Sequence, residues 1–510
     1  MRGIVTDIED KKFRKRSADY IRLSGTKHDG TRRFYGTPHP IPYHHASTFI
    51  HKHWRKFERQ FSKSRFSVGM PKVLPDDADR AVQVTSLSEL SSETQKRLGF
   101  APFVLKTDIS QFFPSIYTHS ISWAAHGIEA SKADTRYDSL ELPFNELDWH
   151  VRNCQLAQTR GVLVGPDAFR LVAEYIATAI DVELADVVGG LIVGAARHVD
   201  DFYIGLRSES DALIVLSRFR EVLQKFELQI NDTKTRIFSS LEPINDLWAQ
   251  GLRRLAPSSS FDTSTEYFLD RAVQISSEMR TSSPLKIALR SLDQIKSYRN
   301  SQSWQNTEPF LQRICFHHPH CIDYVALLVV KRFAIEEAID VHGWTQTCAS
   351  LLERHIALNH HHEILWLLWL MLACRLPLSV DLCAALARVP NAHITALLSF
   401  AFVDGRITRR PVIKFGNRLS TSDTAWLSNL VARCSGFTRA SFGGDYSAEF
   451  EHFAGRNLSL IDIQGYVDTQ AGSTKAAISR TRYGYDDREE DVLIPAWMDD
   501  DDDDDDDIDF

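Results

Sequence analysis

The chain has 510 residues, of which 43% are hydrophobic and 25% are charged, and its formal net charge is −8. This composition is that of a globular protein of roughly two to four domains, and it excludes a disordered or fibrous chain. Residues 486–510 hold fifteen acidic residues and one basic residue, a charge of −14, so residues 1–485 carry +6. Residues 1–75 hold seventeen basic and six acidic residues, a charge of +11. The acidic average therefore does not exclude a polyanionic partner, because binding depends on local charge.

The sequence predicts a cytoplasmic protein. The longest apolar run, Ile364–Cys374, stops at Arg375 and is shorter than the ~18 residues of a membrane span. The first residues contain no apolar stretch of signal-peptide length. The seven cysteines follow no pattern, which indicates reduced thiols rather than a disulfide framework.

The basic region 1–75 contains Pro38, Pro40 and Pro42, which cannot lie in a helix interior. After them, the aromatic spacing over residues 45–66 predicts a basic helix. The region 76–255 differs, because strand and helix patterns alternate there as in an α+β layer. Its predicted elements are a strand at Phe103–Asp108, a helix at Pro166–Val182, strands at Gly189–Gly194 and His198–Leu206 around a turn, and a helix at Ser208–Leu228.

From residue 256 to 485 strand patterns nearly vanish and amphipathic helices follow one another. A spacing of roughly 20 residues per helix predicts either an α-solenoid of the HEAT type or a plain helical bundle. Residues 486–510 form an acidic tail that we expect to be disordered. The predicted helices are Thr265–Met279, Ser283–Tyr298, Asp323–Val341, Trp344–His355, His362–Arg375, Ser379–Val389 and His393–Phe402.

Carboxylates provide the strongest chemical signal. Asp108 ends the first predicted strand, and Asp200 and Asp201 lie in the predicted hairpin. Adjacent carboxylates among apolar strand residues are costly to bury unless a cation compensates them. Successive strand residues point to opposite faces, so one aspartate of the hairpin and Asp108 can face the same ligand. Such a pair can hold two Mg²⁺ ions together with phosphate oxygens, which suits phosphoryl transfer; a solvated Asp-Asp turn is the alternative.

Four motifs resemble those of reverse transcriptases, in the same order over residues 103–238. They are DISQFF from Asp108, QTRGVLVGP from Gln158, HVDDF from His198 and LQINDTKT from Leu228. The resemblance implies a fingers–palm fold and DNA synthesis from dNTPs with two Mg²⁺ ions, or Mn²⁺. His198 stands where the family has Tyr or Phe, and Val199 where Ala is commonest, a departure on the primer–template side. The implied catalytic residues are Asp108, Asp200 and Asp201, and the implied metal-binding residues are these three with Ile109.

The same resemblance implies residues that bind the nucleotide. Phe113 matches the aromatic residue under the nucleotide sugar, which favours deoxynucleotides. Gln158 and Gly161 match the motif that contacts the incoming nucleotide, and Lys234 matches a lysine near the triphosphate. Each of these residues could instead have a structural or solvated role. The residues that match the family's triphosphate-gripping finger residues are Arg65 and Lys72.

A palm that runs directly into a long helical region is similar to the abortive-infection and other defence-associated reverse transcriptases of bacteria. This likeness implies a HEAT-like domain in place of the thumb and a bacterial, antiphage function. It also implies template-independent synthesis of single-stranded DNA primed by a hydroxyl of the protein, in a homo-oligomer such as a trimer or hexamer. Candidate priming residues in the basic, Pro/Gly-rich segment are Tyr20, Tyr35 and Tyr43.

Two other functions stay open. The protein could reverse-transcribe a noncoding RNA bound by residues 1–75, or the palm could be inactive and the helices a scaffold. Cations interleaved with rings suit single-stranded nucleic acid, although ordinary helix-surface charge would look the same. These residues are Arg32, Arg33, Phe34, Tyr35, Lys52, Trp54, Arg55, Lys56 and Arg59.

Three further features have weaker interpretations. The stretch Cys315–Cys321 and the cluster His360–His362 contain metal-ligand residue types, but neither has zinc-finger spacing. The acidic run Asp499–Asp507 could compete for a basic groove or hold Mg²⁺ loosely, or simply keep the chain soluble.

Overall fold

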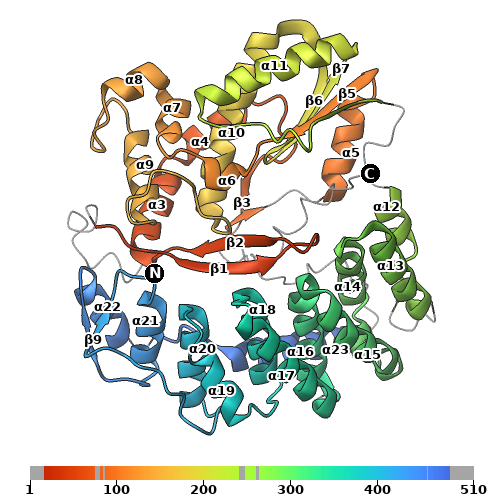
Figure 1. Ribbon diagram of the computed structural model, residues 1–510, viewed down its shortest axis with the longest axis vertical. Helices are drawn as coiled ribbons and strands as arrows, with labels where there is room; N and C mark the ends of the chain where they lie inside the picture. Colours follow the sequence, from red (N-terminus) through yellow and green to blue (C-terminus); the bar gives the residue numbers. More distant parts are fainter. Residues whose placement is uncertain are drawn as a thin grey trace.

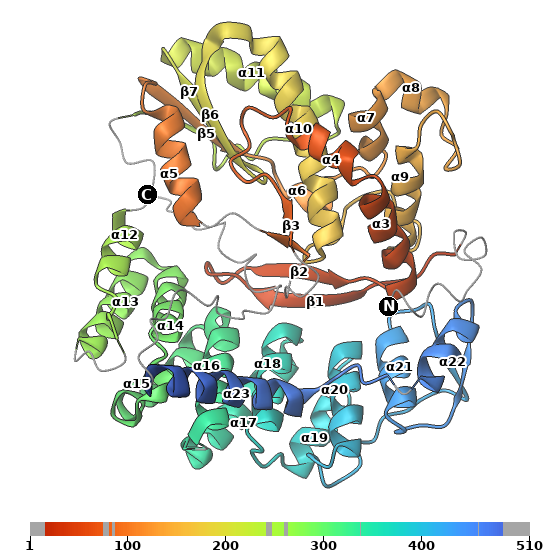
Figure 2. The same ribbon diagram turned by 180° about the vertical axis from the view of Figure 1, so that it is seen from behind.

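The computed structural model describes residues 16–74, 81–83, 87–240, 247–259, 264–336, 338–456 and 458–482. The predicted acidic tail, with its run Asp499–Asp507, lies outside these residues. An α+β part and a helical part lie on opposite sides of the hairpin β1–β2 (Figures 1 and 2). Each part has its own large hydrophobic core.

A four-stranded antiparallel sheet with the strand order β6-β7-β5-β8 organises the α+β part. Both faces of the sheet are covered. Leu105 and Phe202 pack in the core with α11, whereas Val104 and Tyr203 pack with Leu98 of α5 on the other face. Burial on both faces explains the nearly continuous apolar runs of these strands. The bounds are β5 (Phe103–Asp108), β6 (Ile192–His198), β7 (Asp201–Leu206), β8 (Arg236–Ser239), α5 (Leu87–Leu98) and α11 (Glu209–Lys225).

The predicted strand Phe103–Asp108 is confirmed, but the hairpin turn lies elsewhere than predicted. The residues that the sequence analysis placed in the turn, 195–197, continue strand β6 and pair with β7. The loop consists of Val199 and Asp200, so Asp200 is a turn residue and only Asp201 is a strand residue. Cross-strand hydrogen bonds extend to His198 and Asp201, which leaves two residues for the turn.

The helix predicted over Pro166–Val182 is present as α10 (Asp167–Val188), which continues further than predicted and forms the centre of the α+β core. The predicted basic helix over 45–66 is instead two helices that meet at His53. The first begins earlier than predicted, because Pro40 and Pro42 occupy its first turn, where no N–H donor is needed. Further elements of this part are α3 (Pro40–Lys52), α4 (Trp54–Phe61), α6 (Phe112–Ser115), α7 (Ser120–His126), α8 (Ile128–Ala133), α9 (Phe144–Asn153), β3 (Lys72–Val73) and β4 (Val82–Gln83).

The hairpin of β1 (Ile21–Thr26) and β2 (Arg32–Thr37) was not predicted from the sequence. It packs on the helical part, where Arg32 Nη1 donates to Glu363 Oε1 at 2.6 Å and Glu363 is fully buried. The following helices α3 and α4 pack instead on α9 and α10. The region 1–75, expected to act as one unit, therefore divides between the two sides of the molecule.

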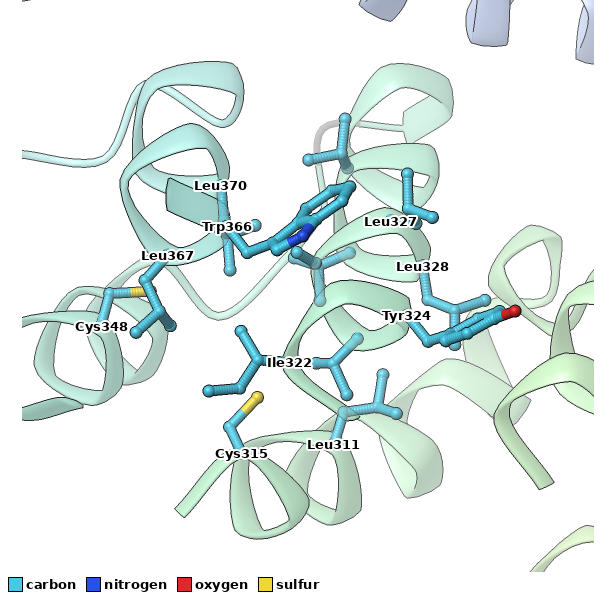
Figure 3. Packing of buried hydrophobic residues seen from close by; sticks show 14 of the residues in the cluster. Leu311, Cys315, Ile322, Tyr324, Leu327, Leu328, Cys348, Trp366, Leu367 and Leu370 are labelled. Atoms are coloured by element: carbon cyan, nitrogen blue, oxygen red, sulfur yellow. The ribbon is translucent and has the colours of Figure 1, made fainter. Parts of the chain in front are cut away.

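The helical part stacks helices that are two apart in the chain, such as α14 on α16, α16 on α18 and α18 on α20. Figure 3 shows the side chains between α15, α16, α17 and α18, among them Cys315, Ile322, Cys348 and Leu367. This arrangement is the one a solenoid requires, and membership of the HEAT type remains a prediction. The helices are α12 (Leu247–Arg254), α13 (Thr265–Met279), α14 (Ser283–Gln294), α15 (Ser301–His317), α16 (Ile322–Glu336), α17 (Val341–Ala357), α18 (His361–Ala373), α19 (Val380–Leu386), α20 (Ala392–Val403), α21 (Trp426–Cys434), α22 (Ser447–Gly455) and α23 (Ile463–Arg482).

Two details differ from the predicted organisation. Leu252 of α12 belongs to the core of the helical part, so these helices begin before the predicted boundary at residue 255. A parallel pair of short strands, β9 (Arg418–Ser420) and β10 (Ser441–Gly443), lies in the region predicted to be helical throughout. Among the described helices, none combines the length and the apolar character that crossing a bilayer requires.

Candidate active site

Two of the predicted catalytic carboxylates face each other across adjacent strands. Asp108 is the last residue of β5 and pairs in register with Asp201, the first residue of β7. Directly opposed residues of antiparallel strands project to the same face, with Cβ atoms about 4.5–5.5 Å apart. Asp108 is buried and Asp201 is partly exposed. Opposed like charges destabilise a sheet, so this pair favours a cation between its oxygens.

The third aspartate lies in the adjoining turn. The main-chain N–H of Ile109 donates to the carbonyl of Asp200 at 3.3 Å, which joins the turn to the end of β5. Val199 has a φ of +52°, whereas Asp200 does not have a positive φ. A positive φ at the first residue of a two-residue hairpin loop normally requires glycine, and a β-branched residue there is strained. Such strain persists where the surroundings hold it in place, typically at functional sites.

Arg197 supplies part of that support. Its side chain is fully buried, and its Nη1 atom donates to the carbonyl of Val199 at 2.9 Å. Its Nε atom is 2.9 Å from both carboxylate oxygens of Asp181, and its Nη2 atom is 2.7 Å from Glu174 Oε1. Glu174 and Asp181 are seven residues apart, so both lie on one face of α10. The guanidinium thus ties the turn beside Asp200 to the central helix.

We call Arg197, Glu174 and Asp181 the arginine anchor. Burial raises the pKa of Asp181 to about 6, against the lowering effect of Arg197. Burial alone would lower the pKa of Arg197, but Asp181 and Glu174 raise it above its usual value. The arginine therefore stays charged. This group was not predicted, although two acidic residues seven apart in an apolar helix are a visible signal in the sequence.

Lys234 lies beside the carboxylates. Its Nζ atom is 3.6 Å from Asp108 Oδ2. The turn that carries it is ordered locally, because Asn231 Oδ1 accepts from both the N–H and the hydroxyl of Thr233. It is also joined to β5, since the N–H of Asn231 donates to the carbonyl of Asp108 at 3.0 Å. The structure therefore brings together Asp108, Asp200, Asp201, Ile109 and Lys234.

The residues predicted to contact the nucleotide begin on the segment after Asp108. Phe113 lies on α6, partly buried, and its carbonyl accepts from the N–H of Val162 at 2.9 Å. Gly161 donates to the carbonyl of Ile116 at 2.7 Å and has a φ of +88°. A Cβ atom on Gly161 would lie 3.2 Å from the carbonyl oxygen of Pro114, so glycine is required for this close approach.

Gln158 is exposed on the same loop. The neighbouring Gln155 is buried instead, and its amide donates to the carbonyls of Gln158 and Gly161 at 3.0 and 2.7 Å. Gln155 therefore shapes the loop while Gln158 is available to a ligand. Arg65 and Lys72 are both exposed; Lys72 lies on β3, and Arg65 precedes a segment, 66–68, that pairs with the edge of β6 at Arg197.

The three candidate priming tyrosines have different surroundings. Tyr20 is partly buried against the α+β core. Tyr35 lines a cavity between the hairpin and the helical part. The hydroxyl of Tyr43 accepts from the N–H of Ala168 at 3.3 Å, and burial raises its pKa to about 12. A high pKa makes the Tyr43 hydroxyl a weaker nucleophile than an exposed tyrosine.

Residue types that suggested zinc do not form a site. Across the described ranges, no three His, Cys, Asp or Glu side chains converge as a metal-binding group. Cys315 and Cys321 are buried in the helical core, and His320 contacts the carbonyl of Thr26 at 2.9 Å. In the cluster His360–His362, His362 Nε2 accepts from Trp366 Nε1 at 3.1 Å. These side chains hold the helical part together.

A magnesium or manganese ion fits the aspartates if substrate phosphates complete its coordination. Carboxylate oxygens are the hard donors that these ions prefer, and two facing carboxylates suffice when substrate phosphates complete the coordination. The register of Asp108 and Asp201 meets this requirement. The absence of a third converging side chain among the described residues means that the protein would supply a minority of the ligands.

The basic and aromatic residues of the N-terminal region separate into two groups. Arg32 is engaged with the buried Glu363, and Trp54 stacks on Phe57, so neither serves as an open contact surface. Phe34 is 47% exposed and lies under the guanidinium of Arg22 at 3.7 Å. Of the other cations predicted to contact nucleic acid, Arg33 is partly buried, whereas the exposed ones lie on α3 or α4 and are Lys52, Arg55, Lys56 and Arg59.

No protein-family model matches the chain. No curated protein matches it. Among solved structures, the chain is similar to the telomerase from Candida albicans, solved in complex with the TWJ fragment of telomeric RNA. The identity is 12% and the TM-score 0.30, over 72% of this chain and 67% of that chain. A likeness of this size supports no statement about activity.

Proposed function

We propose that the chain is a DNA polymerase of the reverse transcriptase family that joins deoxynucleotides to a hydroxyl by two-metal nucleotidyl transfer. The observation that carries the proposal is the register of Asp108 with Asp201 on adjacent strands, with Lys234 Nζ 3.6 Å from Asp108. Together with the order of the four motifs in the sequence, this geometry favours phosphoryl transfer over the alternative of a solvated Asp-Asp turn.

Each residue has a distinct part in the proposed reaction. Asp108 and Asp201, with Asp200 in the adjoining turn, would hold Mg²⁺ or Mn²⁺ and thereby place the nucleotide phosphates. Bound ions neutralise charge that develops on the attacking and leaving oxygens. Lys234 offers a positive charge to the triphosphate, and Phe113 would lie under the sugar and disfavour a 2′-hydroxyl.

The finer proposal is template-independent, protein-primed synthesis of single-stranded DNA in antiphage defence, by a homo-oligomer such as a trimer or hexamer. The resemblance of the sequence to bacterial defence enzymes supports it. The hydroxyl of Tyr20, Tyr35 or Tyr43 would attack the first nucleotide, and the pyrophosphate would leave. Reverse transcription of a noncoding RNA bound near residues 1–75 is the second candidate, favoured by the exposed cations of α3 and α4.

One experiment distinguishes these activities. Purified full-length protein is incubated with labelled dNTPs and Mg²⁺, with and without RNase, and the product is then treated with protease. Product that needs no RNA and shifts on proteolysis supports protein priming, whereas RNase-sensitive product of defined sequence supports reverse transcription. Asp108→Asn should abolish synthesis, and Asp186→Asn, at an exposed position on α10, is the matched control. Absence of product from folded wild-type protein under all conditions would refute the polymerase proposal.

A further inference from the structure

A cavity of about 610 Å³ lies between the hairpin β1–β2 and the helical part. Its lining includes none of the candidate catalytic aspartates. Its walls come from both strands of the hairpin, from the loop Val164–Pro166, from α16, α18 and α20, and from the start of α23. This volume lies within the range of about 300–1,000 Å³ that is typical of small-ligand pockets.

Several aromatic rings line this interdomain cavity together with aliphatic side chains. The rings of Trp366 and Trp369 lie 5.3 Å apart and nearly perpendicular, at 85°. Trp369 meets Tyr466 at 5.3 Å and 73°, and Tyr35 and His362 are 6.4 Å apart from each other. Perpendicular neighbours leave ring faces directed at different sides of the space, which suits a planar ligand that stacks.

The cavity has few polar side chains, and only one of them is a carboxylate. Thr37 Oγ1 lies 2.9 Å from His393 Nε2, and burial lowers the pKa of His393 to about 4, so its imidazole is neutral at pH 7. The lining residues, all of them described, include no Lys or Arg, and their single carboxylate, Asp462, accepts from the N–H of Gly465. Such a lining disfavours a phosphate and favours a neutral ring with hydrogen-bonding edges.

One loop joins the cavity to the candidate active site. The N–H of Gly36 on β2 donates to the carbonyl of Val164 at 3.1 Å, and a Cβ atom on Gly36 would lie 2.9 Å from the side chain of Leu163. The other end of the same loop is held on α6, where the N–H of Val162 donates to the carbonyl of Phe113 at 2.9 Å.

We propose that this cavity binds a nucleobase of a single-stranded nucleic acid. The ring faces of Tyr35, Trp366 and Trp369 stack on the base, and the neutral groups of Thr37 and His393 meet its polar edge. The strand's phosphates remain outside the cavity, whose lining contains no Lys or Arg. The site is separate from the aspartates, so it does not depend on the proposed nucleotidyl transfer, although it would retain the strand which that activity makes or copies.

Photo-cross-linking of the full-length protein tests the proposal. Single-stranded DNA that carries one 5-iododeoxyuridine should cross-link to peptides that contain Tyr35, Trp366 or Trp369. Leu23→Trp fills the cavity and Trp369→Leu removes a ring, and each should raise the Kd for the oligonucleotide by about 5- to 100-fold. Leu140→Trp, at a position that is 98% exposed, is the matched control and should bind like the wild type. Thermal melting of all variants shows that they are folded.

The source of the base and the rival occupant are separated in the same assay. If deoxyadenosine abolishes the cross-link, a free nucleoside is a ligand of the cavity. If the cross-link persists in the presence of deoxyadenosine, the base of the strand is the ligand. Both outcomes support a nucleobase site. Cross-links confined to other surfaces, with folded variants that bind as the wild type does, overturn the proposal. The proposal is also overturned if an apolar peptide occupies the cavity and an oligonucleotide does not. Asp108→Asn should keep the cross-link, which distinguishes failure of this proposal from failure of the polymerase activity.

Discussion

Arg197→Met tests whether the arginine anchor holds the turn that carries Asp200. The substitution keeps an unbranched chain of similar length but leaves Glu174 and Asp181 buried without their cation. Loss of one partner from a buried ion pair costs about 3–5 kcal/mol. For a domain of this size, we expect a melting temperature roughly 10 °C lower at pH 7.5. Arg207→Met, on an exposed arginine just beyond β7, is the matched control and should change it little.

The pH dependence of the variant gives a second test of the same prediction. Burial already raises the pKa of Asp181 to about 6, and loss of the lowering effect of Arg197 raises it further, so the folded state of the variant binds more protons. Its stability therefore rises as the pH falls from 7.5 toward 5.5, and the deficit against the wild type should shrink. Equal melting temperatures of Arg197→Met and wild type at pH 7.5 would refute this reasoning.

Neutralising the carboxyls separates stability from positioning. The triple variant with Arg197→Met, Glu174→Gln and Asp181→Asn removes the buried charges, so we expect it to recover most of the lost stability. It does not restore the hydrogen bond to the carbonyl of Val199. In the synthesis assay its kcat should therefore stay low, while its KM for dNTPs changes less. A triple variant with normal kcat would show that Arg197 has no positioning role.

Three further predictions concern other parts of the fold. Gly161→Ala should lower the free energy of unfolding, measured in urea, by about 1–2 kcal/mol. The loss should exceed that of Gly30→Ala, because Gly30 has a similar φ of +84° but nothing within 4 Å of the new methyl group. Equal losses would contradict the role of the Pro114 contact. Glu363→Gln should lower the free energy of unfolding by about 2–3 kcal/mol, because Arg32 and Thr26 lose their buried acceptor charge. It should also speed amide exchange over residues 21–37, and unchanged exchange would contradict this prediction. His39 is neutral, since burial lowers its pKa to about 3, so stability should fall by about 1.4 kcal/mol per pH unit below pH 6.5; a His39→Gln variant with the same slope would contradict this origin.

The sequence alone determined those features that depend on local periodicity or on short motifs. The strand at Phe103–Asp108 and the helix at Thr265–Met279 have the predicted bounds, because a short apolar run that ends at a carboxylate marks the strand and an amphipathic repeat marks the helix. The resemblance of the motifs also predicted that the aspartates and Lys234 share one site, and Asp108, Asp201 and Lys234 lie side by side in the structure.

Contacts between residues distant in the chain decided the rest. The hairpin β1–β2 has no clear alternation of its own and depends on Glu363, which is 331 residues from Arg32. Arg197 looked like an ordinary basic residue before the motif, and only the packing of β6 against α10 makes it a buried anchor. The turn lies at Val199 and Asp200 because cross-strand hydrogen bonds and this anchor outweigh the backbone preference of a β-branched residue, which no local pattern can reveal.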